Sequence, residues 1–244
     1  MVAGGRPGAV LTVRVVGEPG STNADLLAAA EAGVAEGVWL RAERQLAGRG
    51  RVGRPWADGA GNLFASTIVR LRAADPAAPT LTLVAAVALA EVIDRLAPGL
   101  ATIKWPNDLL IGQAKLSGIL LERGTGDALV IGFGVNLTTP PHLADRPTTC
   151  LAAHGVDVAP AVLLDMLVER LAFWLQRWRQ HDLAAVRDAW ERMAHQRGAM
   201  LRVRLPDGGE REGAFDGLDA VGALRLRGSD GTVTMVHAGD VFAV

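Results

Sequence analysis

The chain has 244 residues, half of them apolar, and a formal net charge of −1 at pH 7. Such a chain can bury a full hydrophobic core, and its composition excludes a disordered or a broadly polyanion-binding protein. A single cysteine, Cys150, excludes an intramolecular disulfide and favours a reducing compartment. Residues 1–8 hold no apolar run of the signal-peptide kind, and the most apolar stretch, 81–93, is too short to span a bilayer. We therefore expect a cytoplasmic protein without a membrane segment.

Apolar periodicity and turn signals predict a mixed series of strands and helices. The expected strands are 11–16, 38–45, 62–71, 101–105, 109–111, 115–122 and 128–137, with hairpin turns at 112–113 and 124–127. The expected helices are 24–35, 79–96, 163–180 and 183–196, the first capped by Ser21, Thr22 and Asn23. The tryptophans of the last two helices, Trp174, Trp178 and Trp190, are interpreted as core anchors. Because βαβ alternation is absent, the predicted class is α+β, with a mixed or antiparallel sheet and flanking helices.

The composition changes after Gly198. Five short β-like runs separated by glycine-rich turns fill the last 46 residues, a pattern typical of a small antiparallel barrel. These runs carry five arginines against seven acidic residues, which disfavours a nucleic-acid-binding barrel. We therefore divide the chain into a main domain, 1–197, and a small barrel domain, 198–244.

Lysine is almost absent from this chain. Only Lys104 and Lys115 occur among 25 basic residues, and they stand 11 positions apart. Because an ammonium is a compact point charge and a guanidinium a planar fork, the two are not interchangeable. The pair therefore indicates a site that needs an ammonium, although mutational bias with two chance survivors explains the same count.

A Gly/Arg loop, residues 48–56 (Gly-Arg-Gly-Arg-Val-Gly-Arg-Pro-Trp), lies between two predicted strands. Its glycines let backbone N–H groups turn toward a ligand, and its arginines suit phosphate or carboxylate. It lacks the Gly-Lys-Ser/Thr ending of a P-loop. A solvated surface loop, an RNA-binding patch and a nucleotide site therefore all remain open.

A second group of polar residues begins at a strand end, in Lys104-Trp-Pro-Asn-Asp108. Asp108 is suited to hold Mg²⁺ or a substrate ammonium, and Asn107 to reach a phosphate or a base, but the same residues also make a good turn. Lys115 follows a short hairpin and can return to this face. In Gly132-Phe-Gly-Val-Asn136 the glycines serve close packing or a ligand, and Asn136 is a candidate for adenine recognition.

Taken in order, these motifs resemble the biotin protein ligase family. The likeness runs from about residue 11 to 137 and rests on residues 48–56, Lys104 to Asp108, Lys115-Leu-Ser-Gly-Ile-Leu120, 132–137, and Ser21-Thr22-Asn23 ahead of Gln45. Ser117 is a mild departure within it. The resemblance implies a class II synthetase-like main domain and an SH3-like C-terminal barrel. Some family members begin with a DNA-binding helix-turn-helix domain, for which the segment before the first predicted strand is too short, so no nucleic acid is expected.

The resemblance also implies a chemistry and a set of site residues. Biotin is activated by ATP as biotinyl-5′-AMP and then transferred to a lysine of a biotin carboxyl carrier protein. ATP and Mg²⁺ act as substrate and activator, and no prosthetic group or enzyme nucleophile is needed. The implied biotin-binding residues are Ser21, Thr22, Asn23, Gln45, Arg49, Gly50, Arg51, Lys115 and Gly118. The implied nucleotide-binding residues are Arg49, Arg51, Arg54, Trp56, Asn107, Asp108 and Asn136.

Lys115, Arg51 and Asp108 are the implied catalytic residues, with Asp108 also the candidate Mg²⁺ ligand. The expected partner is the carrier domain of an acyl-CoA carboxylase, and the expected state is a monomer or weak dimer. Lipoate ligation, which shares the fold and chemistry but not the Gly/Arg loop, is the alternative enzyme. A catalytically silent RNA-binding protein is the alternative from another class. The role of Lys104 stays open between a structural and a supporting one.

Overall fold

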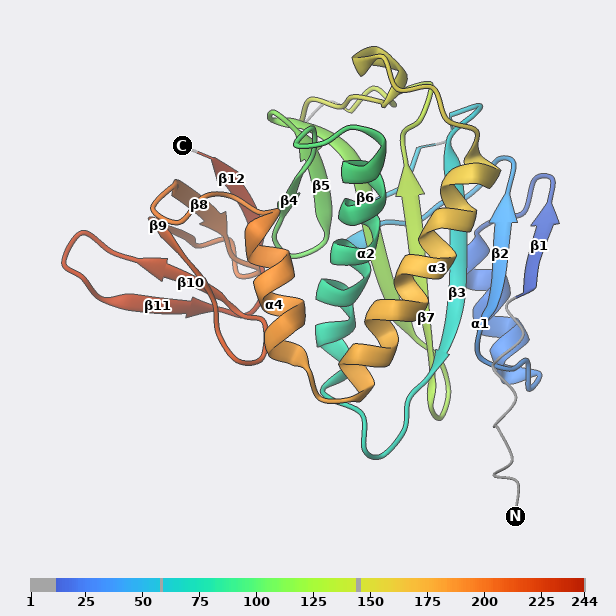
Figure 1. Ribbon diagram of the computed structural model, residues 1–244, viewed down its shortest axis with the longest axis horizontal. Coiled ribbons are helices and arrows are strands. Elements are labelled where there is room, and N and C mark those ends of the chain that lie inside the picture. The colour runs from blue at the N-terminus through green and yellow to red at the C-terminus, as the bar shows by residue number, and fades with distance from the viewer. Residues whose placement is uncertain (1–11, 58, 144–145, 244) are drawn as a thin grey trace.

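A seven-stranded sheet forms the centre of the molecule (Figure 1). The computed structural model describes residues 12–57, 59–143 and 146–243. Across the sheet the strands are β1 (Thr12–Val16), β2 (Val38–Ala42), β3 (Leu63–Arg70), β7 (Ala128–Val135), β6 (Ala114–Arg123), β5 (Asp108–Ile111) and β4 (Thr102–Lys104). β1 and β2 are parallel, and every other neighbouring pair is antiparallel. The predicted mixed sheet is confirmed.

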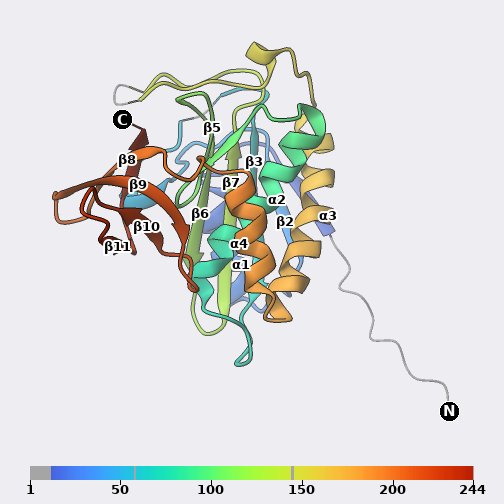
Figure 2. The same cartoon turned by 60° about the vertical axis from the view of Figure 1, so that its left-hand side comes forward.

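Helices cover both faces of this sheet because its central strands are apolar on both sides. α1 (Thr22–Glu31) packs Leu26 and Ala30 on one face, against Ile68 of β3 and Val130 of β7. The opposite face is covered by α2 (Leu81–Leu96), α3 (Pro160–Arg179) and α4 (Leu183–Arg192), as Figure 2 shows. α2 is buried nearly all round, as expected of a helix without a polar face.

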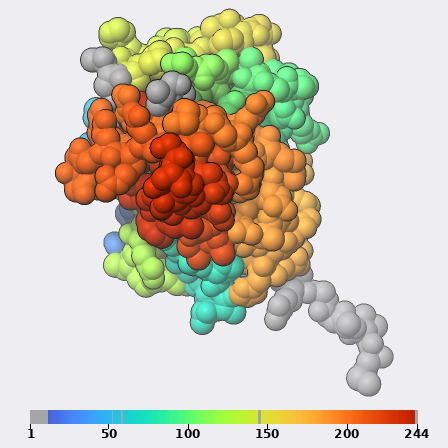
Figure 3. All heavy atoms as spheres, turned by 90° about the vertical axis from the view of Figure 1, so that its left-hand side faces the viewer, coloured from blue at the N-terminus to red at the C-terminus, as the bar shows by residue number. Residues whose placement is uncertain are grey.

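The C-terminal residues form a five-stranded antiparallel sheet. Its strands are β8 (Met200–Arg204), β9 (Glu210–Leu218), β10 (Leu224–Arg227), β11 (Val233–Val236) and β12 (Asp240–Ala243), in the order β11-β10-β9-β8-β12. The last strand returns to pair with the first of the module, as in a small barrel. The ring centroids of Phe215 and of Trp190 in α4 lie 6.3 Å apart. The Trp105 indole N–H donates to the Gly222 carbonyl at 3.0 Å. These contacts connect the C-terminal module to the rest of the chain, and in Figure 3 the two parts form one continuous surface.

The predicted strands and helices are all present, with shifts at their ends. Residue 11 of the first expected strand lies outside the described residues. Ser21 occupies the N-cap of α1 without a side-chain capping bond, and Thr22 and Asn23 belong to the helix itself, so the predicted capping by these side chains is wrong. α4 ends at Arg192 because the next residues leave the helix to pair with the edge of β4: Ile103 N–H donates to Met193 O at 2.7 Å.

The structure also bears on the expected burial of three tryptophans, on membrane segments and on the division into domains. Trp174, Trp178 and Trp190 are at most 5 % exposed, which confirms them as core residues. Three short 3-10 helices, η1 (Arg51–Gly53), η2 (Ala78–Thr80) and η3 (Ala152–His154), complete the described elements. No helix in the described part of the chain has the length and apolarity needed to cross a membrane. The division at residue 198 stays a proposal; apolar residues of the main sheet, its helices and the C-terminal sheet share one core.

Candidate active site

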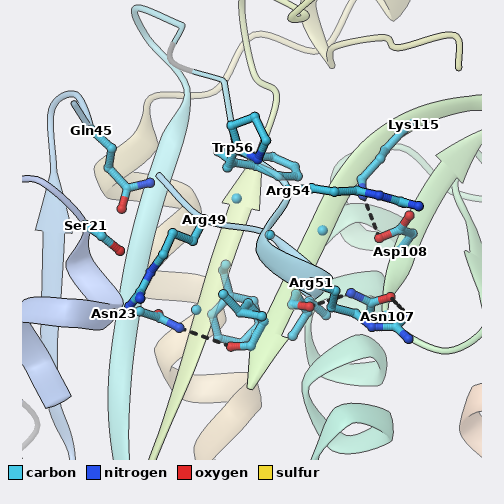
Figure 4. A pocket seen from close by; sticks show the side chains of 18 of the residues that line it. Ser21, Asn23, Gln45, Arg49, Arg51, Arg54, Trp56, Asn107, Asp108 and Lys115 are labelled. Carbon is cyan, nitrogen blue, oxygen red and sulfur yellow. Dashed lines mark hydrogen bonds and ion pairs between the residues drawn. The ribbon is translucent and has the colours of Figure 1, made fainter. Parts of the chain in front are cut away.

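A cavity of about 380 Å³ lies beyond the N-terminus of α1, on the same face of the sheet (Figure 4). Its floor is built by strand alternation: Ser66 is two residues from Ile68, and Gly132 is two residues from Val130, so both face the α1 side. The cavity is lined by every predicted site residue except Asn136. Thirteen positions that are scattered over nearly 100 residues of sequence therefore meet in one place.

Glycines in the floor make room for two site side chains. A Cβ at Gly132 would stand 2.2 Å from Asn23 Oδ1, and one at Gly134 would stand 2.4 Å from Trp56 Cε2. A Cβ at Gly118 would lie 2.8 Å from the same indole. The absence of side chains at these three positions therefore lets Asn23 and Trp56 rest directly on β6 and β7.

One end of the cavity holds a buried cluster of neutral polar side chains, next to the ion pair of Arg49 and Glu122. Gln45 Oε1 accepts hydrogen bonds from the Thr22 backbone N–H (2.8 Å) and from the Thr22 hydroxyl (3.1 Å). The Thr22 hydroxyl lies 2.7 Å from that of Ser66, which donates to Asn23 Oδ1 at 2.6 Å. Such a set of neutral donors and acceptors is suited to an uncharged polar ring rather than to an ion.

The Gly/Arg loop closes over the cavity as a short hairpin. Gly50 N–H donates to Arg54 O at 2.7 Å, Trp56 N–H donates to Gly48 O at 2.8 Å, and Arg49 and Pro55 form a bridge. Gly53, at the turn, has φ +70°, a conformation that glycine adopts without strain. The glycines of the loop thus allow a tight hairpin.

Each arginine of this loop reaches a different wall. Arg49 pairs with Glu122 of β6 at 3.2 Å, and Arg51 donates to Asn107 Oδ1 at 3.0 Å. Arg54 pairs with Asp240 of β12 at 3.0 Å. Burial opposes ionisation of Asp240, yet the guanidinium groups of Arg54, Arg51 and Arg146 hold the pKa of its carboxyl below the usual value. The loop is thus tied to the main sheet twice and to the C-terminal module once.

The other end of the cavity is charged. Lys115 Nζ lies 2.8 Å from Asp108 Oδ1, and both side chains are largely buried. Arg146 lies 3.9 Å from the second oxygen of Asp108. Lys115 also lies 5.2 Å from the centroid of the Trp56 ring, a cation–π contact. Cations outnumber carboxylates here, which favours an anionic ligand.

Asn136 is the one predicted site residue that does not line the cavity. It is 2 % exposed, and its side-chain N–H groups donate to Thr149 O (3.0 Å) and Lys115 O (3.3 Å). Its amide therefore fixes the backbone around Lys115. A contact between Asn136 and a nucleotide stays a prediction.

The described residues build no resident metal site around Asp108. They contain no cluster of three or more histidine, cysteine, aspartate or glutamate side chains placed to hold a metal ion. The two carboxylates that line the cavity, Asp108 and Asp240, already face cations. Mg²⁺ usually combines one or two carboxylates with phosphate oxygens and water, so it fits here only together with a bound polyphosphate.

The sequence reasoning missed three polar residues that line the cavity, Ser66, Arg146 and Asp240, and also Glu122, which pairs with Arg49. Ser66 has a sequence signal, since it is a small hydroxyl within an otherwise apolar strand whose neighbours are buried. The other three are ordinary charged residues in their local sequence. Only the tertiary structure brings them to the site.

Two family models match this chain. Residues 33–136 match the Biotin/lipoate A/B protein ligase family, and residues 202–244 match the Biotin protein ligase C terminal domain. Both models describe ligases. The first falls on the main sheet and the second on the C-terminal sheet. The class is therefore that of biotin and lipoate ligases.

Similar proteins narrow this class. A biotin–[acetyl-CoA-carboxylase] ligase of Paracoccus denitrificans is 37 % identical over 235 residues, 91 % of this chain and 96 % of its own. The biotin protein ligase of Aquifex aeolicus in complex with biotin and ATP has a TM-score of 0.84 and 24 % identity, covering 96 % and 99 % of the two chains, and shows the shared fold. The biotin protein ligase of Leishmania major in complex with biotinyl-5-AMP has a TM-score of 0.66 and 26 % identity, covering 93 % of this chain and 99 % of its own. The chain belongs to the biotin protein ligase family.

Proposed function

We propose that this protein is an ATP-dependent ligase that activates biotin as biotinyl-5′-AMP and attaches it to a lysine of a biotin carboxyl carrier protein. One observation carries the proposal: a single cavity joins a neutral polar cluster at one end to a buried Lys115–Asp108 pair at the other. Biotin is a molecule with the same division, an uncharged ureido ring joined to a carboxylate by an apolar tail. Family membership supports the same assignment.

The neutral cluster receives the ureido ring. Thr22, Gln45 and Ser66 present hydroxyl and amide groups that accept and donate hydrogen bonds. The tail then extends along the bare backbone of β6 and β7 toward Lys115. Lys115 and Arg51 hold the carboxylate, which agrees with their place at the charged end (Figure 4).

Adenylation needs two anions to meet. A carboxylate oxygen of biotin forms a bond to the α-phosphorus of ATP while the bond to the β-phosphate oxygen breaks, and pyrophosphate leaves with that electron pair. Charge on the phosphoryl oxygens must be stabilised at this stage. Lys115, Arg51 and Arg54 supply positive charge in a partly buried site. Arg49 adds to this charge once its guanidinium leaves Glu122 to contact the phosphates of the nucleotide.

Mg²⁺ would enter the site together with ATP. Because both oxygens of Asp108 face cations, we assign the phosphates of ATP as the main ligands of Mg²⁺ and Asp108 as its candidate protein ligand. When bound, Mg²⁺ neutralises charge on the leaving phosphates. Trp56 and Asn107 are the proposed nucleotide contacts that line the cavity, and Asn136, also a proposed nucleotide contact, holds the backbone of Lys115 and Thr149.

Transfer uses the same charged end. The neutral amine of the carrier lysine attacks the carbonyl carbon of the mixed anhydride, AMP leaves, and the amine loses a proton. Asp108 is placed beside Lys115 to orient that amine and to accept the proton. The acceptor is the carrier domain of an acyl-CoA carboxylase, and the cytoplasm is the proposed location because ATP and such carriers are found together there.

Biotin-dependent exchange of labelled pyrophosphate into ATP tests the activation step. We expect exchange with biotin and MgATP, none without biotin, and much less with lipoate in its place. The absence of exchange from a folded protein that retains RNA in a salt-sensitive manner would instead support the binding-protein alternative.

A further inference from the structure

Glu122 of β6 lies behind the neutral end of the main cavity without lining it. In the register of β6 with β7 it stands opposite Val130, whose side chain packs under α1. Residues that stand opposite each other on neighbouring strands share a face of the sheet, so Glu122 points to the cavity side. Its side chain is 24 % exposed. Glu122 therefore acts on a ligand only through the residues that it touches.

The Glu122 carboxylate receives two donors. Arg49 pairs with it at 3.2 Å, and Asn23 Nδ2 donates to it at 2.8 Å; Figure 4 shows Asn23 and Arg49 at the same end of the cavity. A carboxylate paired with a guanidinium accepts hydrogen bonds and donates none. The Leu120 carbonyl, 3.4 Å from the same Nδ2, is a second acceptor. The Asn23 amide must therefore turn its NH₂ group toward β6 and its Oδ1 away from it.

This orientation fixes the hydroxyl groups of the neutral cluster. Asn23 Oδ1 accepts the hydrogen of the Ser66 hydroxyl at 2.6 Å. A hydroxyl has a single hydrogen, so Ser66 has none left for the Thr22 hydroxyl, which lies 2.7 Å away. Thr22 is then the donor in that contact, and its hydrogen is shared at most with Gln45 Oε1 at 3.1 Å. Both hydroxyl hydrogens are thus held within the protein.

The consequence for a ligand is a choice between donors and acceptors. The Thr22 and Ser66 oxygens offer only lone pairs to the cavity, so a ligand N–H is favoured there and a ligand oxygen or sulfur is not. The ureido ring of biotin carries two N–H groups, whereas the dithiolane ring of lipoate carries none. We propose that Glu122 is a positioning residue that fixes the direction of this hydrogen-bond chain and thereby selects a ring with N–H donors. The inference rests on the proposed function.

The first test replaces the acceptor with an amide of the same size. Glu122→Gln leaves one acceptor for two donors, so either Arg49 loses its partner or the Asn23 amide turns round. A reversed amide donates to Ser66, whose hydrogen then points into the cavity against the ureido N–H. We expect about tenfold weaker biotin binding by isothermal titration calorimetry, the scale of one lost hydrogen bond.

Glu18→Gln is the matched control for the loss of a negative charge. Glu18 also pairs with an arginine, Arg44, at 3.1 Å, and it does not line the cavity. This variant should bind biotin as the unmodified protein does. Thermal unfolding of each variant checks that the fold is kept.

A rescue experiment separates direction from packing. In the double variant Asn23→Asp/Glu122→Gln, the new amide accepts from Arg49 and donates to the new carboxylate, which in turn accepts from Ser66. The direction of the chain is thereby restored with the original net charge. Biotin affinity should return to within about threefold of the unmodified protein and exceed that of Glu122→Gln alone. A purely structural role of Glu122 predicts no such recovery, because the second change would only add to the first.

A change in the ligand gives a second readout. In the two cyclic carbamate analogues of biotin, an oxygen replaces one or the other ureido N–H. The unmodified protein should bind at least one of them about tenfold or more weaker than biotin, because an oxygen then faces hydroxyl oxygens. In Glu122→Gln the Ser66 hydrogen is free to turn toward that oxygen, so the ratio should fall to about threefold. A general loosening of the site would weaken both ligands equally and leave the ratio unchanged.

Biotin affinity in Glu122→Gln equal to that of the unmodified protein would overturn the inference. An equal loss in Glu18→Gln, a double variant no better than Glu122→Gln, or an unchanged carbamate ratio would overturn it as well. Failure of the proposed function is a different result, in which the unmodified protein itself does not bind biotin.

Discussion

Replacing Lys115 with arginine keeps the charge and changes only its shape. In the structure Nζ is confined: it lies 2.8 Å from Asp108 Oδ1 and 5.2 Å from the centroid of the Trp56 ring. It also lies 3.1 Å from the place that a Cβ at Gly118 would occupy. A guanidinium is broader and prefers two aligned acceptors. Both oxygens of Asp108 would supply these, so the group would turn toward Asp108 and away from the biotin carboxylate.

The expected cost follows from this displacement. A shift of about 1 Å in a positioning group costs around a hundredfold in rate, which equals about 2.7 kcal/mol of transition-state stabilisation. We therefore expect Lys115→Arg to fold normally and to lose about a hundredfold in biotin-dependent ATP–pyrophosphate exchange. Lys104→Arg is the comparison: Lys104 does not line the cavity that receives the biotin carboxylate, so the loss should be smaller. A Lys115→Arg protein with nearly full exchange would refute this reasoning and favour chance survival of the two lysines.

Three further predictions concern other parts of the site. Gly132→Ala should weaken biotin binding at least tenfold by calorimetry, because the new Cβ would stand 2.2 Å from Asn23 Oδ1, whereas Gly17→Ala, with nothing within 4 Å, should bind normally. Trypsin should cut residues 49–54 more slowly in the presence of biotin and ATP, because ligand anions relieve repulsion among the loop arginines, and equal cutting would show that ligands do not order the loop. Asp240→Asn should speed release of bound biotinyl-AMP by no more than about fivefold, since its partner Arg54 is half exposed. The pKa of the Asp240 carboxyl is held below its usual 3.8, so Asp240 stays ionised and paired with Arg54 at any pH above about 3.8. The pair is lost only at lower pH, and the rate of biotinyl-AMP release should therefore not change between pH 8 and pH 5.

The fold could be predicted largely because its strands and helices carry strong local patterns. The apolar residues of β3 and α2, for example, identify central elements without any tertiary information. Element ends were harder, since they depend on tertiary pairing. α4 stops where Met193 O accepts a hydrogen bond from Ile103 N–H, a contact across 90 residues of sequence.

The site could be predicted where a motif carries its chemistry in consecutive residues. The Gly/Arg loop and the segment from Lys104 to Asp108 are such motifs, and most of their polar side chains, those of Arg51, Asn107 and Asp108 among them, line the main cavity. Arg146 and Asp240 could not be predicted, because each comes from a segment with no distinctive pattern and reaches the site only through the fold. Asn136 shows the converse: its motif is distinctive, yet its amide donates to the backbone of Lys115 and Thr149 and does not line the cavity.

The most direct test is the mass of an acceptor. A purified biotin carboxyl carrier domain is incubated with this protein, biotin and MgATP, and its intact mass is measured. We expect one added biotinyl group on a single lysine, absent when biotin or ATP is omitted and absent when the acceptor lysine is replaced by arginine. A folded protein that leaves the carrier unmodified, or that adds a lipoyl group in preference to biotin, would contradict its function as a biotin protein ligase.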